Sequence, residues 1–208
     1  TYFTMKLNAG GLNFQCIKPQ SHPDKTIFED IKKEIEGQVA TIETITKSHK
    51  KSYPQQLFSL TDLQQEAYKR YHLGPKETLN TLQALYERHK LVTYPRTDSN
   101  YLTDDMVDTL KDRLQAIMAT TLKDIAKGQM SQSFSAKQRF VNNSKVSDHH
   151  AIIPTEVRPD MNQLSQRESK IYMMIAQRYL ENLMPPHEYE AVSIELSVGR
   201  YKFTFKDK

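Results

Sequence analysis

Residues 192–205 read VSIELSVGRYKFTF, and this stretch indicates the fold class. Apolar and polar residues alternate on both sides of Gly199-Arg200, a pattern typical of two strands joined by a two-residue turn. Residues 3–16 repeat this alternation around the turn at 8–11. The sequence therefore predicts a hairpin near each end of the chain. Because consecutive strands usually pair, we expect both hairpins to share one sheet.

The middle of the chain has the periodicity of helices, because apolar residues recur there at three- and four-residue spacing. Capping boxes at Thr61-x-x-Gln64 and Ser165-x-x-Glu168 mark two of the starting points. Helices are expected over 61–73, 76–90, 104–117 and 166–184, with a shorter helix at 26–36 and a strand at 39–46. The predicted class is α+β, with a helical domain (58–186) inserted into a β-rich domain (1–57 and 187–208).

The composition is that of a globular protein: of 208 residues, 38% are hydrophobic and 26% are charged. No apolar run approaches the roughly 18 residues that cross a bilayer, so no membrane partner is expected. Cys16 is the only cysteine. This excludes an internal disulfide and a multi-cysteine zinc site, and it fits a reducing, cytoplasmic location.

The net charge of +4 is unevenly distributed. Residues 123–147 contain five basic residues and one acidic residue among many Ser, Gln and Asn. We expect a flexible segment here whose charge suits a nucleic-acid backbone. The alternative interpretation is an ordinary solvated loop.

The stretch TYPRTDS (93–99) follows the second predicted long helix. Pro95 favours extended backbone at Tyr94, and in extended backbone Tyr94 and Arg96 point to the same side. Arginine holds a phosphate through two parallel hydrogen bonds, and tyrosine serves as a covalent nucleophile. The pair predicts phosphodiester chemistry through a phosphotyrosine. The alternative is a structural Tyr94, since tyrosine is common at strand ends.

The stretch SDHHAIIPT (147–155) is a second candidate cluster. A histidine accepts a proton when neutral and holds a phosphate when charged, and Asp148 is placed to orient an imidazole. His149 and His150 point to opposite sides of an extended backbone, which argues against one shared metal ion. These residues alone do not decide which histidine matters.

The two stretches together, in this order, resemble the signatures of type IA DNA topoisomerases, as does LTDLQ at 60–64. Pro95, and His150 after His149, make the chain more similar to the topoisomerase III branch than to bacterial topoisomerase I. The resemblance covers essentially the whole chain.

The resemblance implies roles for single residues. Tyr94 matches the nucleophile that attacks single-stranded DNA and becomes linked to its 5′ phosphate. Arg96 matches the arginine that positions this phosphate, and His149 matches a histidine that contacts it. Three further residues lie inside the matching motifs and are expected to contact DNA: Ser99, His150 and Thr155.

The family also has a Toprim domain whose glutamate and Asp-x-Asp cluster bind Mg²⁺. No Asp-x-Asp occurs in this sequence, so no metal ligand or cofactor is assigned to the chain, and Mg²⁺ is expected in a longer parent enzyme. The resemblance implies a central fragment, made of the family's β-rich arch and its tyrosine-bearing helical domain. Such a fragment is expected to be inactive alone, with single-stranded DNA and the remaining domains as partners.

Two alternatives belong to other functional classes. The predicted helices at 61–73 and 76–90 have the arrangement of a helix-turn-helix DNA-binding module. Against this, Glu77 and Glu87 offset the basic residues of the second helix. The other alternative is a protein-interaction fragment in which Tyr94 is incidental.

Overall fold

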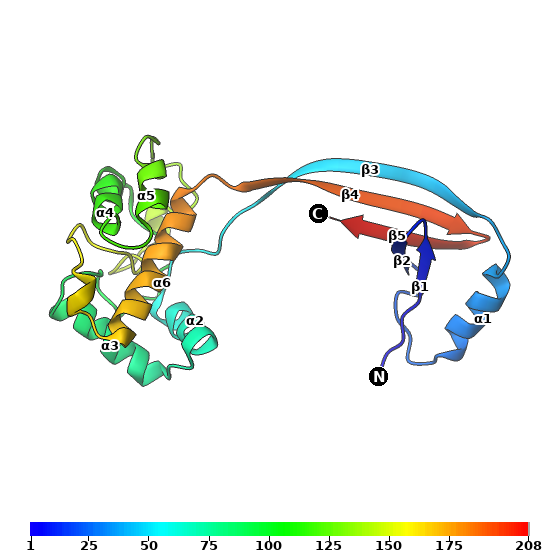
Figure 1. The fold of residues 1–208 in the computed structure, drawn as a ribbon, viewed down its shortest axis with the longest axis horizontal. Coiled ribbons are helices and arrows are strands. Elements are labelled where there is room, and N and C mark those ends of the chain that lie inside the picture. Colours follow the sequence, from blue (N-terminus) through cyan, green and yellow to red (C-terminus); the bar gives the residue numbers. More distant parts are fainter. Residues whose placement is uncertain (208) are drawn as a thin grey trace. The chain divides into compact units, whose positions relative to one another are not determined.

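The computed structural model describes residues 1–207 (Figure 1). The chain forms two compact units: one comprises residues 1–52 and the segment from His187, and the other comprises Tyr53–Pro186. The first unit contains one antiparallel sheet and helix α1, while the second is helical. The α+β class is therefore confirmed. The sequence places the first boundary at 57/58, whereas the first unit ends at Ser52, where β3 ends.

The sheet has five strands in the order β1-β2-β5-β4-β3. Their bounds are Lys6–Ala9 (β1), Leu12–Cys16 (β2), Ala40–Ser52 (β3), His187–Val198 (β4) and Tyr201–Asp207 (β5). The two predicted hairpins are β1–β2 and β4–β5. They join where Cys16 pairs with Phe203, so the expectation that both hairpins share one sheet is confirmed.

Helix α1 (Thr26–Ile35) completes the core of this unit. Its buried residues Phe28, Ile31 and Ile35 recur at three- and four-residue spacing, which gives the helix one apolar face. That face joins a cluster to which the sheet contributes, among others, Phe14 and Phe203. Burial of these side chains, at roughly 2 kcal/mol each, is what fixes α1 to the sheet.

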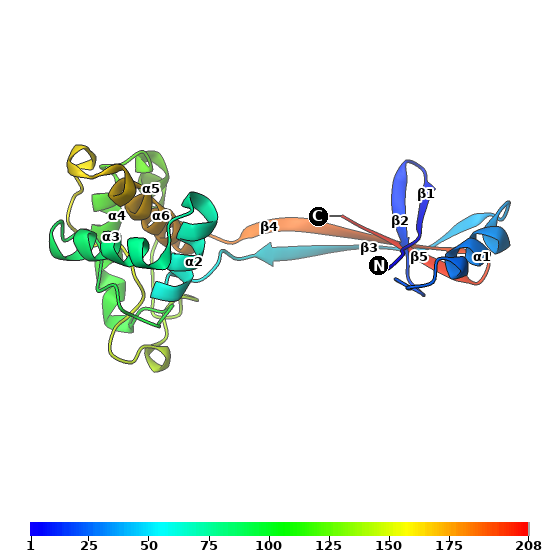
Figure 2. The same cartoon turned by 90° about the horizontal axis from the view of Figure 1, so that it is seen from below.

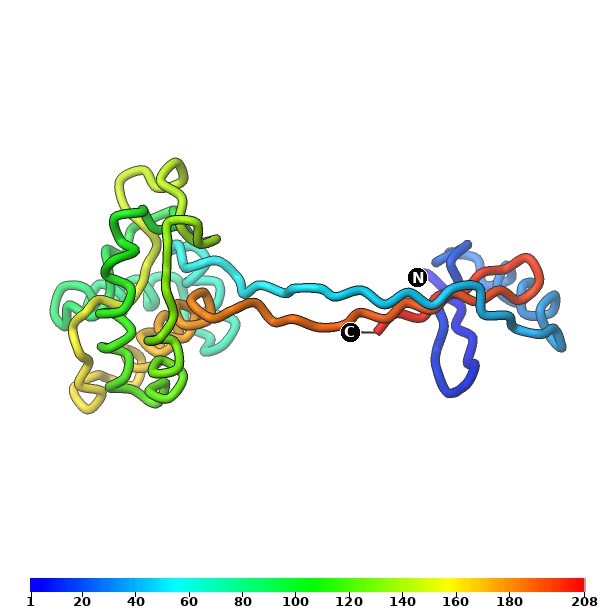
Figure 3. The backbone as a smooth tube through the Cα atoms, turned by 90° about the horizontal axis from the view of Figure 1, so that it is seen from above, coloured from blue at the N-terminus to red at the C-terminus, as the bar shows by residue number. Residues whose placement is uncertain are grey.

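Strand β3 extends beyond its predicted end at Thr46. Residues 47–52 read KSHKKS and carry no strand signal of their own. The structure nevertheless pairs them with β4, and Figures 2 and 3 show the two strands side by side. Ion pairs such as Lys51–Glu188 (2.8 Å) cross between the strands, but exposed pairs contribute little. The backbone ladder with β4 therefore specifies this polar half.

The helical unit is built around α6 (Gln166–Leu183), which buries Tyr172, Ile175 and Tyr179. The other helices are α2 (Leu60–Tyr71), α3 (Pro75–Glu87), α4 (Leu110–Ile117) and α5 (Lys123–Gln129). The predicted third helix begins as a 3₁₀ helix, Asp104–Thr109, before α4. Helix α3 packs against both α2 and α6.

Helix α5 shows that the expected flexible segment over 123–147 is wrong at its start. Residues Lys123–Gln129 are helical, and Ala126 and Gln129 are buried. The helix has only seven residues, and most of its side chains are polar. Its contacts with the rest of the unit, rather than its own periodicity, therefore hold it in place.

The start of α2 also differs from the prediction. Ser59, not Thr61, is the N-cap, because its hydroxyl accepts a hydrogen bond from the Asp62 backbone amide at 3.2 Å. The predicted capping box at Ser165-x-x-Glu168 is confirmed at the start of α6. In the part of the chain that the structure describes, no helix is long and apolar enough to cross a membrane.

Candidate active site

The two motif stretches lie side by side in the helical unit. Val92 and Pro154 form an antiparallel bridge. The Thr93 amide donates to the Ile153 carbonyl at 3.0 Å, and the Ile153 amide donates to the Thr93 hydroxyl at 3.0 Å. The apolar end of the second stretch thus fixes the backbone immediately before Tyr94.

The backbone after Tyr94 is held as well. The Thr97 hydroxyl donates to the His149 carbonyl at 2.8 Å. The Thr97 carbonyl accepts a hydrogen bond from the Leu60 amide at 2.9 Å. Further along, the Ala151 amide donates to the Tyr101 carbonyl at 2.9 Å. The segment that carries Tyr94 and Arg96 is therefore anchored on both sides, by the second stretch and by the start of α2.

Tyr94 is half-buried between two rings. Its ring centroid lies 4.1 Å from that of His149, with an angle of 36° between the planes. Tyr86, on α3, meets it edge to face at 5.6 Å. Such contacts restrict the phenol to a narrow range of positions. The structure therefore brings together Tyr94 and His149, which are separated by more than fifty residues in the sequence.

Arg96 is exposed and lines a pocket of about 410 Å³. We call this pocket the Arg96 groove; its other lining residues include Thr61, Asp98, Asp148 and His149. Among the described residues, no hydrogen bond or ion pair engages the Arg96 guanidinium. An unused guanidinium beside an imidazole suits a phosphate, whereas the two carboxylates in the groove limit its positive charge.

The two adjacent histidines have different surroundings. His149 is exposed, stacks on Tyr94 and lines the Arg96 groove. His150 is half-buried, and its Nδ1 donates to the Ala151 carbonyl at 2.8 Å. Burial lowers the pKa of His150, which favours the neutral ring. No hydrogen bond joins the Asp148 carboxylate to either imidazole in the described part of the chain.

Ser99 and Thr155 hold backbone in this structure. Ser99 is buried; its hydroxyl donates to the Lys145 carbonyl at 2.8 Å and accepts from the Tyr101 amide at 3.1 Å. The Thr155 hydroxyl donates to the Lys90 carbonyl at 2.6 Å. Both side chains thus have a structural role, and their contact with DNA stays a prediction, as it does for His150.

Three residues of the site are not among those predicted from the sequence: Tyr86, Thr61 and Asp98. Tyr86 looks like one more member of the apolar stripe of its helix, and Thr61 like a cap. Only the tertiary structure places Tyr86 beside Tyr94 and Thr61 beside Arg96, whereas Asp98 follows from the alternation of an extended segment. Within residues 1–207, no group of three or more His, Cys, Asp or Glu side chains is placed to hold a metal ion.

The motif geometry and fold agree with the comparisons to known proteins. The model of the DNA topoisomerase family matches residues 1–208, and the chain belongs to this family. It is 82% identical over 208 residues to DNA topoisomerase 3 of Staphylococcus saprophyticus. It is 58% identical over 207 residues to DNA topoisomerase 3 of Staphylococcus haemolyticus. The chain spans 29% of the length of each relative.

A solved structure shows the same fold. Full-length topoisomerase I from Thermotoga maritima superimposes with a TM-score of 0.66 at 24% identity. The match covers 99% of this chain and 34% of that one. The predicted resemblance to type IA topoisomerases of the topoisomerase III branch is therefore confirmed at the level of the family, and a helix-turn-helix regulator is disfavoured.

Proposed function

We propose that this chain is the part of a DNA topoisomerase that carries the nucleophile, and that Tyr94 cleaves single-stranded DNA. The observation that carries the proposal is the convergence of Tyr94, Arg96 and His149. The pairing of the two motif stretches places the phenol against the imidazole, and both Arg96 and His149 line one groove.

The reaction is an exchange of esters. The Tyr94 phenol oxygen bonds to phosphorus, the bond from phosphorus to the 3′ oxygen breaks, and the phenol proton is transferred to the departing 3′ oxygen, which becomes a hydroxyl. The DNA is left with a 5′-phosphotyrosyl link. Attack by the same 3′ hydroxyl reverses every step, so the phosphodiester is restored without ATP. Strand passage between the two steps changes DNA topology.

Arg96 and His149 assist at the phosphate. The guanidinium donates two parallel hydrogen bonds to the non-bridging oxygens and stabilises their charge in the transition state. In this proposal His149 contacts the same phosphate beside the phenol, and its imidazole transfers the proton. These assignments rest on the groove that both side chains line, on the ring contact of His149 with Tyr94, and on the position of Arg96 two residues after Tyr94.

The two units have separate roles in this proposal. Residues 53–186 are one continuous segment, whereas the sheet unit is assembled from both sides of it in the sequence. This supports a helical domain inserted into an arch. We infer that the helical domain moves to open a passage for a second strand and that the arch supplies the hinges.

Other parts of the enzyme complete the site. The family's Mg²⁺ belongs to the Toprim domain, and the described residues offer no cluster that replaces it. Mg²⁺ would supply charge stabilisation at the phosphate when bound. We therefore propose that this chain does not cleave DNA alone, and that it acts with those domains on single-stranded DNA in the cytoplasm. Mg²⁺-dependent cleavage of oligonucleotides by the isolated chain would contradict this.

The test of the nucleophile uses the full-length protein that contains this chain. Wild-type enzyme should trap single-stranded DNA covalently, and Tyr94→Phe should abolish the trapped species while leaving the fold unchanged. Tyr68→Phe is the matched control, because Tyr68 is an exposed tyrosine of the same unit that lies outside the Arg96 groove. Covalent trapping that survives Tyr94→Phe refutes the assignment.

A further inference from the structure

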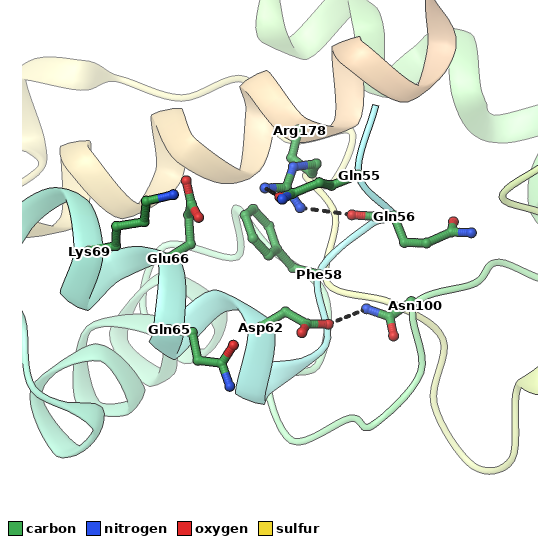
Figure 4. A pocket seen from close by; sticks show the side chains of 9 residues that line it. All are labelled: Gln55, Gln56, Phe58, Asp62, Gln65, Glu66, Lys69, Asn100 and Arg178. Carbon is green, nitrogen blue, oxygen red and sulfur yellow. Dashed lines mark hydrogen bonds between the residues drawn. The ribbon is translucent and has the colours of Figure 1, made fainter. Parts of the chain in front are cut away.

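A second pocket, of about 510 Å³, lies in the helical unit (Figure 4). We call it the amide pocket. Its walls come from the chain segment before α2, from α2 itself, from Asn100 just after the Tyr94 motif, and from α6. Asp62 lines this pocket, while its neighbour Thr61 lines the Arg96 groove. The two pockets therefore have neighbouring lining residues in the first turn of α2.

The floor of the amide pocket consists of an arginine held over an aromatic ring. The Arg178 guanidinium lies 4.1 Å from the centroid of the Phe58 ring, and both side chains are buried. Arg178 donates to the Gln56 carbonyl at 2.9 Å and to the Gln55 side-chain oxygen at 2.8 Å. Its Nε also pairs with Glu181. Each of the three guanidinium nitrogens of Arg178 thus has a partner within the protein, and the residue is only 6% exposed.

The rim, by contrast, offers unused amide groups. Gln65 is exposed, and no hydrogen bond joins its side chain to another described residue. Asn100 donates twice through Nδ2, to the Leu57 carbonyl and to the Asp62 carboxylate, both at 2.6 Å, so its Oδ1 remains available. A carboxamide presents a donor and an acceptor side by side, as does the edge of a nucleobase.

The charge of the pocket also favours a neutral ligand. Asp62 and Glu66 offset Lys69 and Arg178 among the lining residues. A pocket for a phosphate needs free cationic donors, and this one has no excess positive charge. Lys69, for which the described residues supply no ion-pair partner, is the one cation at the wall with an unused head group. It is suited to the phosphate next to a bound base.

We propose that the amide pocket holds one unpaired nucleobase of the DNA strand engaged at Tyr94. The base lies over the Arg178–Phe58 floor and is bonded at its edge by Gln65 and Asn100. The inference rests on the proposed function, since it needs a single strand at the Arg96 groove. Its chemistry is distinct, because the groove binds phosphate and the pocket binds a base.

The test measures binding of short single-stranded oligonucleotides to the 208-residue chain by fluorescence anisotropy. Oligonucleotides of about six nucleotides limit the number of binding registers. One nucleotide at a time is replaced by an abasic site. Removal of one particular base should weaken binding about fivefold or more, whereas removal of the others should have smaller effects.

Two variants on α2 separate a base contact from a general effect. Gln65→Ala should weaken binding of the intact oligonucleotide about fivefold, the effect of one hydrogen bond, and should abolish the response to the critical abasic position. Gln64→Ala is the matched control, since Gln64 bonds the Pro75 carbonyl and lies outside the pocket. Its binding should follow that of the wild type.

Several outcomes overturn the inference. Tight binding that ignores every abasic position, or a Gln65→Ala variant that keeps the wild-type abasic response, removes the nucleobase pocket and leaves the Tyr94 proposal standing. Absence of binding to any oligonucleotide removes the inference together with single-strand binding by this chain. Covalent trapping through Tyr94 in the full-length protein is scored separately.

Discussion

Arg178 and Arg96 line two pockets of the same unit, yet they are held in opposite ways. Arg178 is 6% exposed and bonded to Gln55, Gln56 and Glu181. Arg96 is exposed and has no hydrogen bond or ion pair with any described residue. A buried arginine whose three nitrogens all have partners inside the protein supports the fold, whereas an exposed arginine without such partners is available to a ligand. Arg178 thus stabilises the fold, whereas Arg96 is free for the phosphate contact that we propose.

Among the variants that test the contrast between Arg178 and Arg96, Arg178→Ala should have the largest effect on stability. The change removes the hydrogen bonds to the segment before α2, uncovers the Phe58 ring and leaves partly buried acceptors unpaired. We expect the free energy of unfolding of the helical unit to fall by about 3 kcal/mol. Urea unfolding followed by circular dichroism measures this loss.

The matched control is Arg167→Ala on the same helix. Arg167 is exposed and pairs with Glu77 at the surface, so its loss should cost about 0.5 kcal/mol or less. If Arg178→Ala were as mild as Arg167→Ala, the bonded floor of the amide pocket would have no structural role. The contrast with Arg96 would then fail.

The contact between Arg88 and Glu168 makes the stability of the helical unit depend on pH. Partial burial tends to raise the pKa of Glu168. The Ser165 amide and hydroxyl and the Arg88 guanidinium outweigh that effect and lower the pKa to about 2, from a usual 4.5. His89 also contacts the same carboxylate, at 3.3 Å. Glu168→Gln should therefore reduce the free energy of unfolding by about 2 kcal/mol at neutral pH.

The sign of the pH effect follows from the lowered pKa. The stabilisation by Glu168 is present above the pKa of the unfolded chain and is lost as the pH falls through the folded value, so it disappears between about pH 5 and pH 2. Wild-type and Glu168→Gln stabilities, measured by urea unfolding, should converge over this range. A difference that stays constant with pH would mean that the ionised carboxylate contributes nothing.

The sequence predicts best those parts of the site that depend on local spacing. Tyr94 and Arg96 are two residues apart around a proline, so their common direction follows from backbone geometry alone. The choice between His149 and His150 does not follow in this way, because the neighbouring sequence does not distinguish two adjacent histidines. It depends on which ring meets Tyr94, and that is decided by the pairing of Val92 with Pro154.

The same distinction applies to the fold. Both hairpins and α6 carry their own alternation, turns or caps, and they were predictable. Helix α5 and the polar half of β3 carry no such signal, because partners elsewhere in the chain specify them. Ser99 shows the limit for single residues: its motif predicts a DNA contact, while its hydroxyl bonds two backbone groups.

Arg96→Ala tests the exposed arginine of the pair. It should change the free energy of unfolding least, within about 0.5 kcal/mol, because the side chain is exposed and unpaired among the described residues. Its effect should instead appear in binding to single-stranded oligonucleotides. Loss of a bidentate phosphate contact should weaken binding about tenfold and reduce the salt slope by roughly 0.7, since one fewer counterion is released. Anisotropy titrations at several salt concentrations give both quantities.

Two further variants separate position from charge. Arg158→Ala removes an exposed arginine of the same unit that lies outside the Arg96 groove, so it should leave the affinity nearly unchanged. Arg96→Lys keeps the charge but loses the two parallel hydrogen bonds, so it should retain the salt slope and recover only part of the affinity. If Arg158→Ala matched Arg96→Ala, binding would depend on overall charge, and Arg96 would be no more a ligand-binding arginine than any other at the surface.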